Sequence, residues 1–405
     1  MRTKLTTMLR PLTLFLFLSL FTFATACKKS APPPSSPPAT SAATPTPVEY
    51  HTGGGTTPTL PAKYFQGSIG DSLDLQMKLM RNGDQVSGSY SYTKVGTKID
   101  LKGKVDKDGN LTLEEFDPSG KQTGVFQGLW KTDGPDGPVT LAGNWSKPAG
   151  DKAADKKTAF SLHEEPINLS GDVDVVAKRI KESSKPLMYE IEAQYPQLTG
   201  GSNPNFEKFN QTVRASVTKK VAMFKKEMAP KEGEEEPRPE GSMGSDLSIS
   251  YTVAMVQEDL ASIEFDVGAY YMGAAHPNSY SEVVNYDLKN GKLLKLSDLF
   301  TPGAKFLPVI SAYCIKDLKS QSKSKEGMLE DESWIEKGAG PSMQNYKSWT
   351  IAKKGLGINF DSYQVGPYAA GPQSVLVPYS AIKDLVNPSG PIGQFASAPA
   401  TAKKQ

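Results

Sequence analysis

The chain of 405 residues is long enough for two or three domains, and its 38% hydrophobic and 22% charged residues are ordinary for a soluble globular protein. It carries 46 basic and 44 acidic residues without a long basic block, so the sequence predicts no nucleic-acid partner. Its two cysteines, Cys27 and Cys314, cannot build a disulfide framework or a four-cysteine metal site.

The first 26 residues have the layout of a secretory signal peptide. Basic residues near the start precede an almost wholly apolar run from Leu12 to Phe23, which is too short to remain as a membrane span. Residues 24–27 (ATAC) resemble the lipobox of bacterial lipoproteins, although Ala24 stands where those boxes usually have Leu. We therefore expect acylation at Cys27. An ordinary A-x-A cleavage site beside an incidental cysteine is the alternative.

A lipid on Cys27 implies an exported protein anchored in the bacterial cell envelope. Lys28 follows the cysteine and, by resemblance to enterobacterial sorting, permits the outer membrane, so we expect the outer membrane or the periplasmic face. Residues 27–60 are rich in Pro, Ser, Ala and Thr and have almost nothing to bury, which predicts a disordered tether. The tail from 391 to 405 is small and polar and is expected to fray.

The first folded unit, residues 61–165, is predicted to be all-β. Short strands recur at nearly regular spacing between Gly-rich turns, which predicts an up-and-down meander that closes into a small barrel. Four aromatic residues of this unit either fill the barrel core or line a sugar-binding mouth, namely Tyr90, Phe126, Trp130 and Trp145.

The second folded unit, residues 166–390, is predicted to be an α+β domain with an antiparallel sheet and packed helices. A strand from Met188 to Pro196 precedes a helix that we expect Asn203 to cap, and a strand from Leu247 to Val256 follows the helix. The helix repeats apolar residues every three or four positions, which predicts a face packed on a sheet: Phe206, Phe209, Val213, Val217, Val221, Phe224 and Met228.

The stretch from Ala261 to Phe300 is central to this domain. Ile263, Phe265 and Val267 alternate with polar or small residues, as in a strand with one buried face. A partner strand from about Tyr280 to Leu288 predicts an antiparallel pair, and the Gly-, Pro- and Asn-rich residues 273–278 form the loop between the two strands.

Further along, Thr301 and Pro302 are expected to start a helix with a buried stripe that includes Cys314. Three short strands and a helix capped by Ser380 complete the domain. The predicted strands are Trp349–Ile351, Leu356–Phe360 and Gln373–Val377.

Three runs together resemble the extracellular C-terminal domain of the anti-sigma factor RsiV: GAAHPNSY at 273–280, NYDLKNGKLLKLSDLF at 285–300 and GLGINFDSYQVGPYAAGPQSVLVPYSAIKDLV at 355–386. The resemblance covers roughly residues 185–390 and leaves out the barrel. It implies an extracytoplasmic binding module, because this domain of RsiV receives lysozyme and related modules accompany peptidoglycan deacetylase domains without being the catalyst. The sigma-binding segment and membrane helix of RsiV have no counterpart here, so we expect no sigma regulation.

Two loops of this domain supply the candidate binding residues. The first contains His276, Pro277 and Asn278, and the second contains Pro367 and Tyr368. If the loops lie together they make a binding edge, with Tyr368 as a rigid aromatic anchor displayed to solvent. The alternative is that the prolines only shape turns while His276 satisfies a buried backbone group.

The sequence predicts no metal and no cofactor, since its three histidines are widely spaced and lack zinc-site spacing. Three functions remain open. The leading one is a non-enzymatic envelope lipoprotein that binds an envelope protein or a glycan, with a lysozyme-type muramidase as the ligand that the resemblance suggests. The others are a carbohydrate-active enzyme, modifying peptidoglycan with paired carboxylates, and a passive envelope scaffold.

Overall fold

The structure, a computed structural model, describes residues 61–134, 137–151, 156–229, 244–324 and 331–397. The predicted signal peptide, Cys27 and the predicted tether lie outside these residues. Among the helices in the described ranges, none combines the length and the apolar character that a membrane crossing requires.

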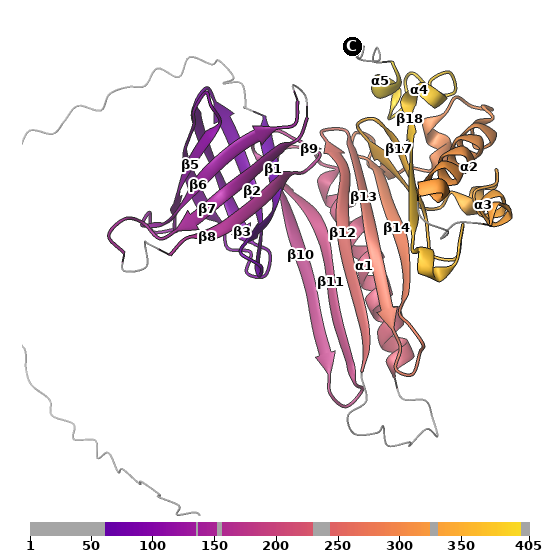
Figure 1. The fold of residues 1–405 in the computed structure, drawn as a ribbon, viewed down its shortest axis with the longest axis horizontal. Helices are drawn as coiled ribbons and strands as arrows, with labels where there is room; N and C mark the ends of the chain where they lie inside the picture. Colours follow the sequence, from indigo (N-terminus) through magenta and orange to yellow (C-terminus); the bar gives the residue numbers. More distant parts are fainter. Residues whose placement is uncertain (1–60, 135–136, 152–155, 230–243, 325–330, 398–405) are drawn as a thin grey trace, which may run out of the picture. The chain divides into compact units, whose positions relative to one another are not determined.

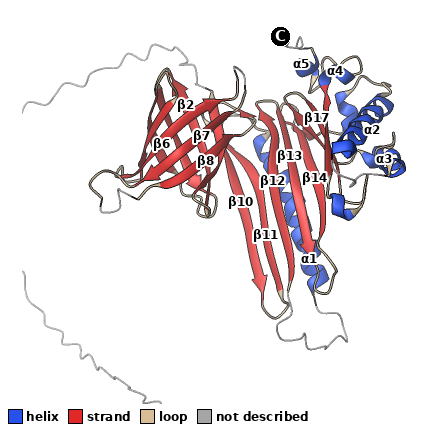
Figure 2. Ribbon diagram, viewed as in Figure 1, coloured by secondary structure: helices blue, strands red, loops and turns tan. Residues whose placement is uncertain are grey.

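Eight antiparallel strands close into a barrel (Figures 1 and 2). Each strand pairs with its neighbours in sequence, and the first strand also pairs with the last, which leaves no barrel edge unpaired. The predicted meander and its closure are confirmed. The strands are β1 (Ala62–Ile69), β2 (Leu73–Asn82), β3 (Gln85–Tyr92), β4 (Ile99–Val105), β5 (Asn110–Phe116), β6 (Gln122–Thr132), β7 (Val139–Ser146) and β8 (Thr158–Glu164).

Aromatic side chains fill much of the barrel interior. Tyr90 and Phe126 are 2% and 0% exposed and meet edge to face, with ring centroids 5.6 Å apart. Trp130 and Trp145 are half-buried and pack against the same hydrophobic cluster. All four residues therefore contribute to the core.

One carboxylate lies inside this barrel. Glu115 follows the inward-facing Leu111 and Leu113 along β5 and is 5% exposed. Its Oε2 accepts hydrogen bonds from the Tyr90 hydroxyl and the Trp145 indole N–H, both at 2.8 Å. Its Oε1 accepts from the Thr123 hydroxyl at 2.6 Å. The buried carboxyl group of Glu115 is thus held by three donors from three other strands.

A mixed sheet forms the first layer of the second domain. Its strands follow the order β10-β11-β12-β13-β14-β15. Two pairs are parallel, β11 with β12 and β9 with β12, and the other pairs are antiparallel. The bounds are β9 (Ile167–Asn168), β10 (Val173–Ser184), β11 (Tyr189–Gly200), β12 (Ser245–Gln257), β13 (Leu260–Tyr270), β14 (Asn278–Asp287) and β15 (Lys292–Leu293). The predicted pair is therefore confirmed as β13 and β14.

Helix α1 (Phe206–Met228) packs on one face of this sheet, as its apolar period predicts. Six of the seven expected residues are buried, and Met228 is partly buried. The helix begins at Phe206 rather than directly after Asn203, because the Asn203 side chain accepts from the Asn205 N–H and closes a turn instead of capping the helix.

The second layer is a sheet of three antiparallel strands with helices packed on it. Its strands are β16 (Trp349–Ala352), β17 (Gly355–Phe360) and β18 (Gln373–Pro378), and its helices are α2 (Phe306–Ser324), α3 (Glu332–Gly338), α4 (Tyr379–Ile382) and α5 (Gly393–Ala396). Short 3-10 turns, η1 (Leu296–Leu299), η2 (Met343–Asn345) and η3 (Tyr368–Ala370), complete it.

Two helix starts in this layer differ from the prediction. Residues 301–304 form a turn closed by the Ala304 N–H and the Thr301 carbonyl, so α2 begins at Phe306. Helix α4 begins at Tyr379, one residue before the expected cap Ser380. The buried stripe of α2 is confirmed, and burial raises the pKa of the Cys314 thiol to about 12, which leaves it an unreactive hydrophobic residue.

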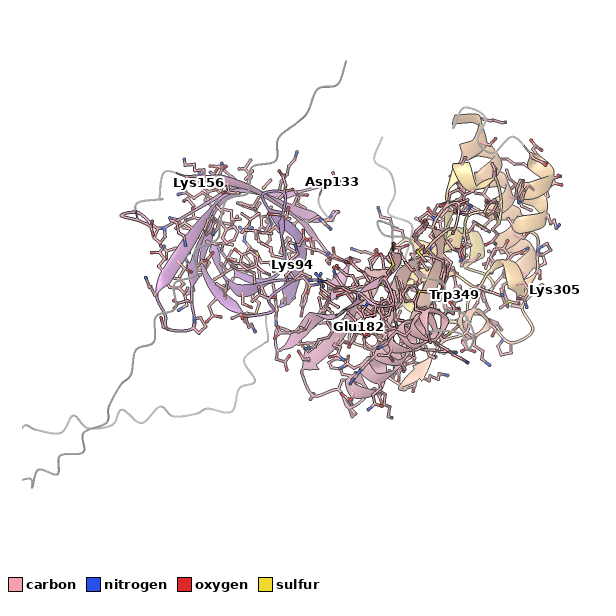
Figure 3. All side chains as sticks on the ribbon, turned by 90° about the horizontal axis from the view of Figure 1, so that it is seen from below. Lys94, Asp133, Lys156, Glu182, Lys305 and Trp349 are labelled. Atoms are coloured by element: carbon pink, nitrogen blue, oxygen red, sulfur yellow. The ribbon has the colours of Figure 1, made fainter. Side chains whose placement is uncertain are left out.

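Buried polar side chains join the two layers. The Ser262 hydroxyl donates to Asn285 Oδ1 at 2.6 Å and accepts from the Ile351 N–H at 2.9 Å. Asn285 Nδ2 donates to the carbonyl of Trp349 at 2.7 Å (Trp349 is labelled in Figure 3). Since Ser262 and Asn285 are 0% and 2% exposed, these bonds fix β16 on the face of β13 and β14 that lies opposite α1.

Candidate functional site

The two loops that carry the candidate residues lie together. The Tyr368 hydroxyl donates to the carbonyl of Pro277 at 3.1 Å, and the Tyr368 ring stacks on His276 with centroids 4.1 Å apart. His276 Nδ1 lies 2.9 Å from the Pro277 carbonyl, which is itself exposed. Tyr368 is half-buried, while His276, Pro277, Asn278 and Pro367 are exposed. The loops thus form one surface, in which Tyr368 is held by His276 and Pro277.

A third ring, which the sequence reasoning missed, belongs to this surface. Tyr363 lies 5.5 Å from Tyr368 and 6.4 Å from His276 between ring centroids. It is 53% exposed, and its φ of 69° is in the left-handed region that residues other than glycine rarely adopt. The Trp334 indole N–H donates to the Tyr363 carbonyl at 3.0 Å and holds this backbone in place. We call His276, Tyr363 and Tyr368 the aromatic corner.

A groove of about 480 Å³ is lined in part by residues that flank the same two loops in the chain. Most of its floor consists of residues of β12, β13 and β14 that alternate with the residues packed on α1, so it lies on the opposite face of the sheet. Its wall comes from the end of β17 and the start of β18. The lining includes five serines (Ser248, Ser250, Ser279, Ser281 and Ser374), two amides (Asn359 and Gln373) and Tyr280.

Three carboxylates face this groove. They belong to Glu264 and Asp266 on β13 and to Asp361 just after β17, and no Lys, Arg or His is among the described residues that line it. Asp361 Oδ1 accepts from the Ser281 N–H at 2.8 Å and from the Ser281 hydroxyl at 2.7 Å. Burial raises the pKa of Glu264 above its ordinary value, and the charges of Asp266 and Asp361 raise it further, while the nearby Asn359 amide lowers it.

Hydroxyls, amides and carboxylates in one groove suit a polar ligand that both donates and accepts hydrogen bonds. Within the ranges that the structure covers, no three His, Cys, Asp or Glu side chains converge so as to hold a metal ion. The groove was not predicted as a site. The alternation along β13 does predict that Glu264 and Asp266 are solvent-facing, but it carries no sign of their neighbour Asp361.

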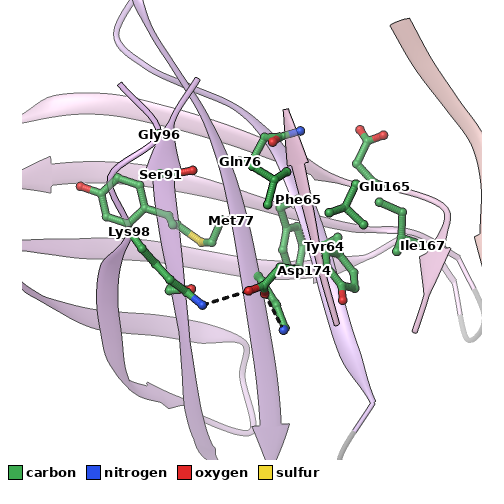
Figure 4. Close-up of a pocket in the computed structure, with 15 residues that line it drawn as sticks. Tyr64, Phe65, Gln76, Met77, Ser91, Gly96, Lys98, Glu165, Ile167 and Asp174 are labelled. Atoms are coloured by element: carbon green, nitrogen blue, oxygen red, sulfur yellow. Dashed lines mark hydrogen bonds and ion pairs between the residues drawn. The ribbon is translucent and has the colours of Figure 1, made fainter. Parts of the chain in front are cut away.

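A second pocket, of about 120 Å³, is lined by residues of β1, β2, β3 and β10 (Figure 4). Its charges are paired with each other, since Asp174 lies 2.7 Å from Lys78 Nζ and 3.1 Å from Lys98 Nζ. The Tyr64 hydroxyl donates to the Val173 carbonyl at 2.5 Å. These contacts join β10 to the barrel strands, which accounts for the pocket without a ligand.

Two family models match parts of the chain. The model described as Deacetylase PdaC matches residues 182–279, and the model described as Protein of unknown function (DUF3298) matches residues 297–380. Both segments fall within the part of the chain for which the sequence predicts an RsiV-like domain. Membership of the RsiV family itself stays a prediction.

One curated relative is the peptidoglycan-N-acetylmuramic acid deacetylase PdaC of Bacillus subtilis (strain 168). It is 25% identical over 180 residues, which cover 44% of this chain and 36% of that protein. The chain thus matches about a third of the length of this relative.

Among solved structures, a member of the DUF3298 family from Bacteroides fragilis is 17% identical, with 56% of this chain and 97% of that chain covered and a TM-score of 0.38. A DUF3298 family protein from Pseudomonas aeruginosa PAO1 is 16% identical, with 53% and 94% covered and a TM-score of 0.38. The rhizavidin–biotin complex covers 25% of this chain and 98% of its own, at 15% identity and a TM-score of 0.20.

Proposed function

We propose that this protein is an exported cell-envelope lipoprotein whose α+β domain binds peptidoglycan glycan without catalysing a reaction. The glycan occupies the groove between β12–β14 and β17–β18, with a sugar ring against the aromatic corner. The barrel and the N-terminal tether carry this domain, and the lipid on Cys27 holds the whole protein at the membrane.

The observation that carries the proposal is the position of the groove. Glu264 and Asp266 lie in the segment that matches the PdaC model, and Asp361 lies in the segment that matches DUF3298. The site therefore exists only where the two segments meet. Since one relative that matches 180 residues of this chain is named for its action on peptidoglycan, peptidoglycan is the ligand class that we assign.

The chemistry of the lining supports a sugar ligand. Sugar hydroxyls donate to carboxylates and accept from serine and amide groups, both of which the groove supplies. Tyr363 and Tyr368 offer flat apolar rings with polar tips, and such rings pack against ligands at a low cost in conformational entropy.

Replacing Tyr368 with alanine is expected to weaken binding to purified peptidoglycan sacculi at least tenfold, because truncation of a central anchor costs more than about 2 kcal/mol of binding. A co-sedimentation titration measures this change, and thermal unfolding is expected to be unaffected. Tyr363→Ala repeats the test at a more exposed ring. Leu129→Ala, on the barrel and 52% exposed, is the control. Normal binding by both tyrosine variants would place the ligand elsewhere.

A second candidate function is a peptidoglycan-modifying enzyme. The observation in its favour is that Glu264, whose pKa is raised by burial, shares a groove with Asp266 and Asp361, and one protonated acid beside a carboxylate is an arrangement that glycoside hydrolysis uses. Sacculi incubated with the protein are expected to release no soluble sugar and no acetate. Release of sugar or acetate that Glu264→Gln abolishes would favour the enzyme.

A lysozyme-type muramidase, added to the binding assay, tests the protein ligand that the RsiV resemblance suggests.

Acylation at Cys27 is a separate prediction, for a residue outside those that the structure describes. Replacing Cys27 with serine is expected to move the protein from the membrane fraction to the soluble fraction, since several acyl chains supply the binding energy for stable attachment. Mass spectrometry of the mature N-terminus is the direct measurement. An unmodified residue at position 27 in membrane-bound protein would contradict the lipid anchor.

A further inference from the structure

The groove has a charge that the protein does not balance. Among the described residues, no ion pair involves Glu264, Asp266 or Asp361, whereas Asp174 in the second pocket has two lysine partners. Asp361 is held by Ser281 through two hydrogen bonds, and these orient the carboxylate without neutralising it. A cation is therefore the complementary charge for a ligand.

The unbalanced charge is combined with a ring surface. Ser279 and Tyr280 on the floor of the groove follow the loop of His276 in the chain, and the wall residues Asp361 and Pro372 bracket in sequence the segment that contains Tyr363 and Tyr368. One aromatic ring, that of Tyr280, thus lies in the lining together with the carboxylates. A ligand that satisfies both features has an apolar ring face next to a positive charge.

We infer that the groove selects glycan in which amino sugars have lost their N-acetyl groups and carry a protonated amine. This inference rests on the proposed function and names the form of the glycan. A protonated amine donates three hydrogen bonds and carries the charge that three carboxylates attract, whereas an acetamide is neutral and donates one. The selection is therefore electrostatic, with the sugar ring held by the aromatic corner.

The class of reaction that supplies this ligand is hydrolytic deacetylation. Water cleaves the amide C–N bond, acetate leaves, and the amine that remains takes up a proton. The protein is therefore placed after such a reaction, as a binder of its product. PdaC of Bacillus subtilis is named for this class of reaction on N-acetylmuramic acid.

The unliganded protein should show a cost for holding Glu264 ionised. A carboxyl group whose pKa is raised by folding binds its proton more tightly in the folded state. Above the raised pKa the ionised Glu264 therefore lowers the free energy of unfolding, and below the ordinary pKa of 4.5 this destabilisation vanishes. Glu264→Gln is thus expected to have a higher Tm than the parent protein at pH 7 and an equal Tm near pH 4. A lower Tm at pH 7 would make Glu264 a structural residue.

The deciding experiment compares glucosamine tetramer with N-acetylglucosamine tetramer by calorimetric titration at pH 6.5 and 150 mM salt, beside sacculus binding. We expect at least tenfold tighter binding of the amine form, and we expect Glu264→Gln and Asp361→Asn to remove this preference. Asp133→Asn, at an exposed turn, is the control for general charge attraction.

Each outcome of that comparison is decisive. Equal binding of the two tetramers, together with normal sacculus binding, would overturn the inference and leave the proposed function in place. A preference that persists in both groove variants would also overturn it, because the amine would then be held elsewhere. Failure to bind either tetramer or sacculi would contradict the proposed function itself.

Discussion

Replacing Glu115 with leucine is expected to lower the free energy of unfolding of the barrel by about 3 kcal/mol or more. The carboxylate accepts hydrogen bonds from Tyr90, Thr123 and Trp145, and each buried donor left without an acceptor costs about 1–3 kcal/mol. Leucine fills most of the volume, so the loss is chiefly one of hydrogen bonding. Urea unfolding followed by tryptophan fluorescence measures it, since Trp145 is one of the donors.

The neighbouring residue supplies the control. Glu114 lies on the same strand but is exposed, so Glu114→Leu is expected to change stability by less than about 0.5 kcal/mol. Similar values for the two variants would show that the Glu115 hydrogen bonds contribute little. Glu115→Gln is expected to fall between them, because an amide keeps one acceptor oxygen and places an N–H₂ group against a donor.

Replacing Asn285 with alanine is expected to cost about 2–4 kcal/mol of stability and to weaken glycan binding as well. Asn285 accepts from Ser262 and donates to the carbonyl of Trp349, so its loss leaves two buried groups unpaired and opens a cavity between the layers. Because β16 pairs with β17, and Asn359 and Asp361 belong to β17 and its end, looser packing of this layer would also widen the groove.

Asn144→Ala, at an exposed position of β7, is the matched control and is expected to be nearly neutral. Thermal unfolding and sacculus co-sedimentation on the same samples separate the two effects. If Asn285→Ala unfolds early yet binds normally while folded, the groove does not depend on how the layers are joined.

Much of the fold follows from local patterns in the sequence. Alternation and Gly-rich turns predict the barrel, because each of its strands pairs with its sequence neighbours and only the closure is long-range. The apolar period from Phe206 to Met228 predicts both the helix and its buried face. Strand β10 was missed because residues 173–184 are mostly half-exposed and polar, so their pattern does not separate a strand from a loop.

The candidate site is less predictable, because it depends on contacts between distant residues. Gly, Pro and Asn in the two loops identify turns. They do not predict that the Tyr368 hydroxyl lies 3.1 Å from the carbonyl of Pro277, a residue 91 positions away in the chain. Tyr363 belongs to no periodic pattern, and its left-handed backbone depends on a contact with Trp334. The charge of the groove arises only when Asp361 meets the solvent-facing side of β13.

A buried carboxylate does leave a trace in the sequence. Glu115 occupies the inward register of β5 after Leu111 and Leu113, where a hydrophobic residue is expected. Such a break in alternation indicates either a functional group or a polar network in the core. The strand assignment alone does not show which, because the donors Tyr90 and Trp145 come from other strands.

Hydrogen exchange with soluble peptidoglycan fragments shows which segments of the protein the glycan contacts. If glycan binds in the groove, amide protection should increase in residues 246–251, 264–268, 278–283 and 359–374, the segments that line it or form its aromatic corner. Residues of the second pocket, around Lys78 and Asp174, should exchange as in the free protein. Protection confined to that pocket or to the barrel, with residues 359–374 unchanged, would show that glycan does not bind in the groove.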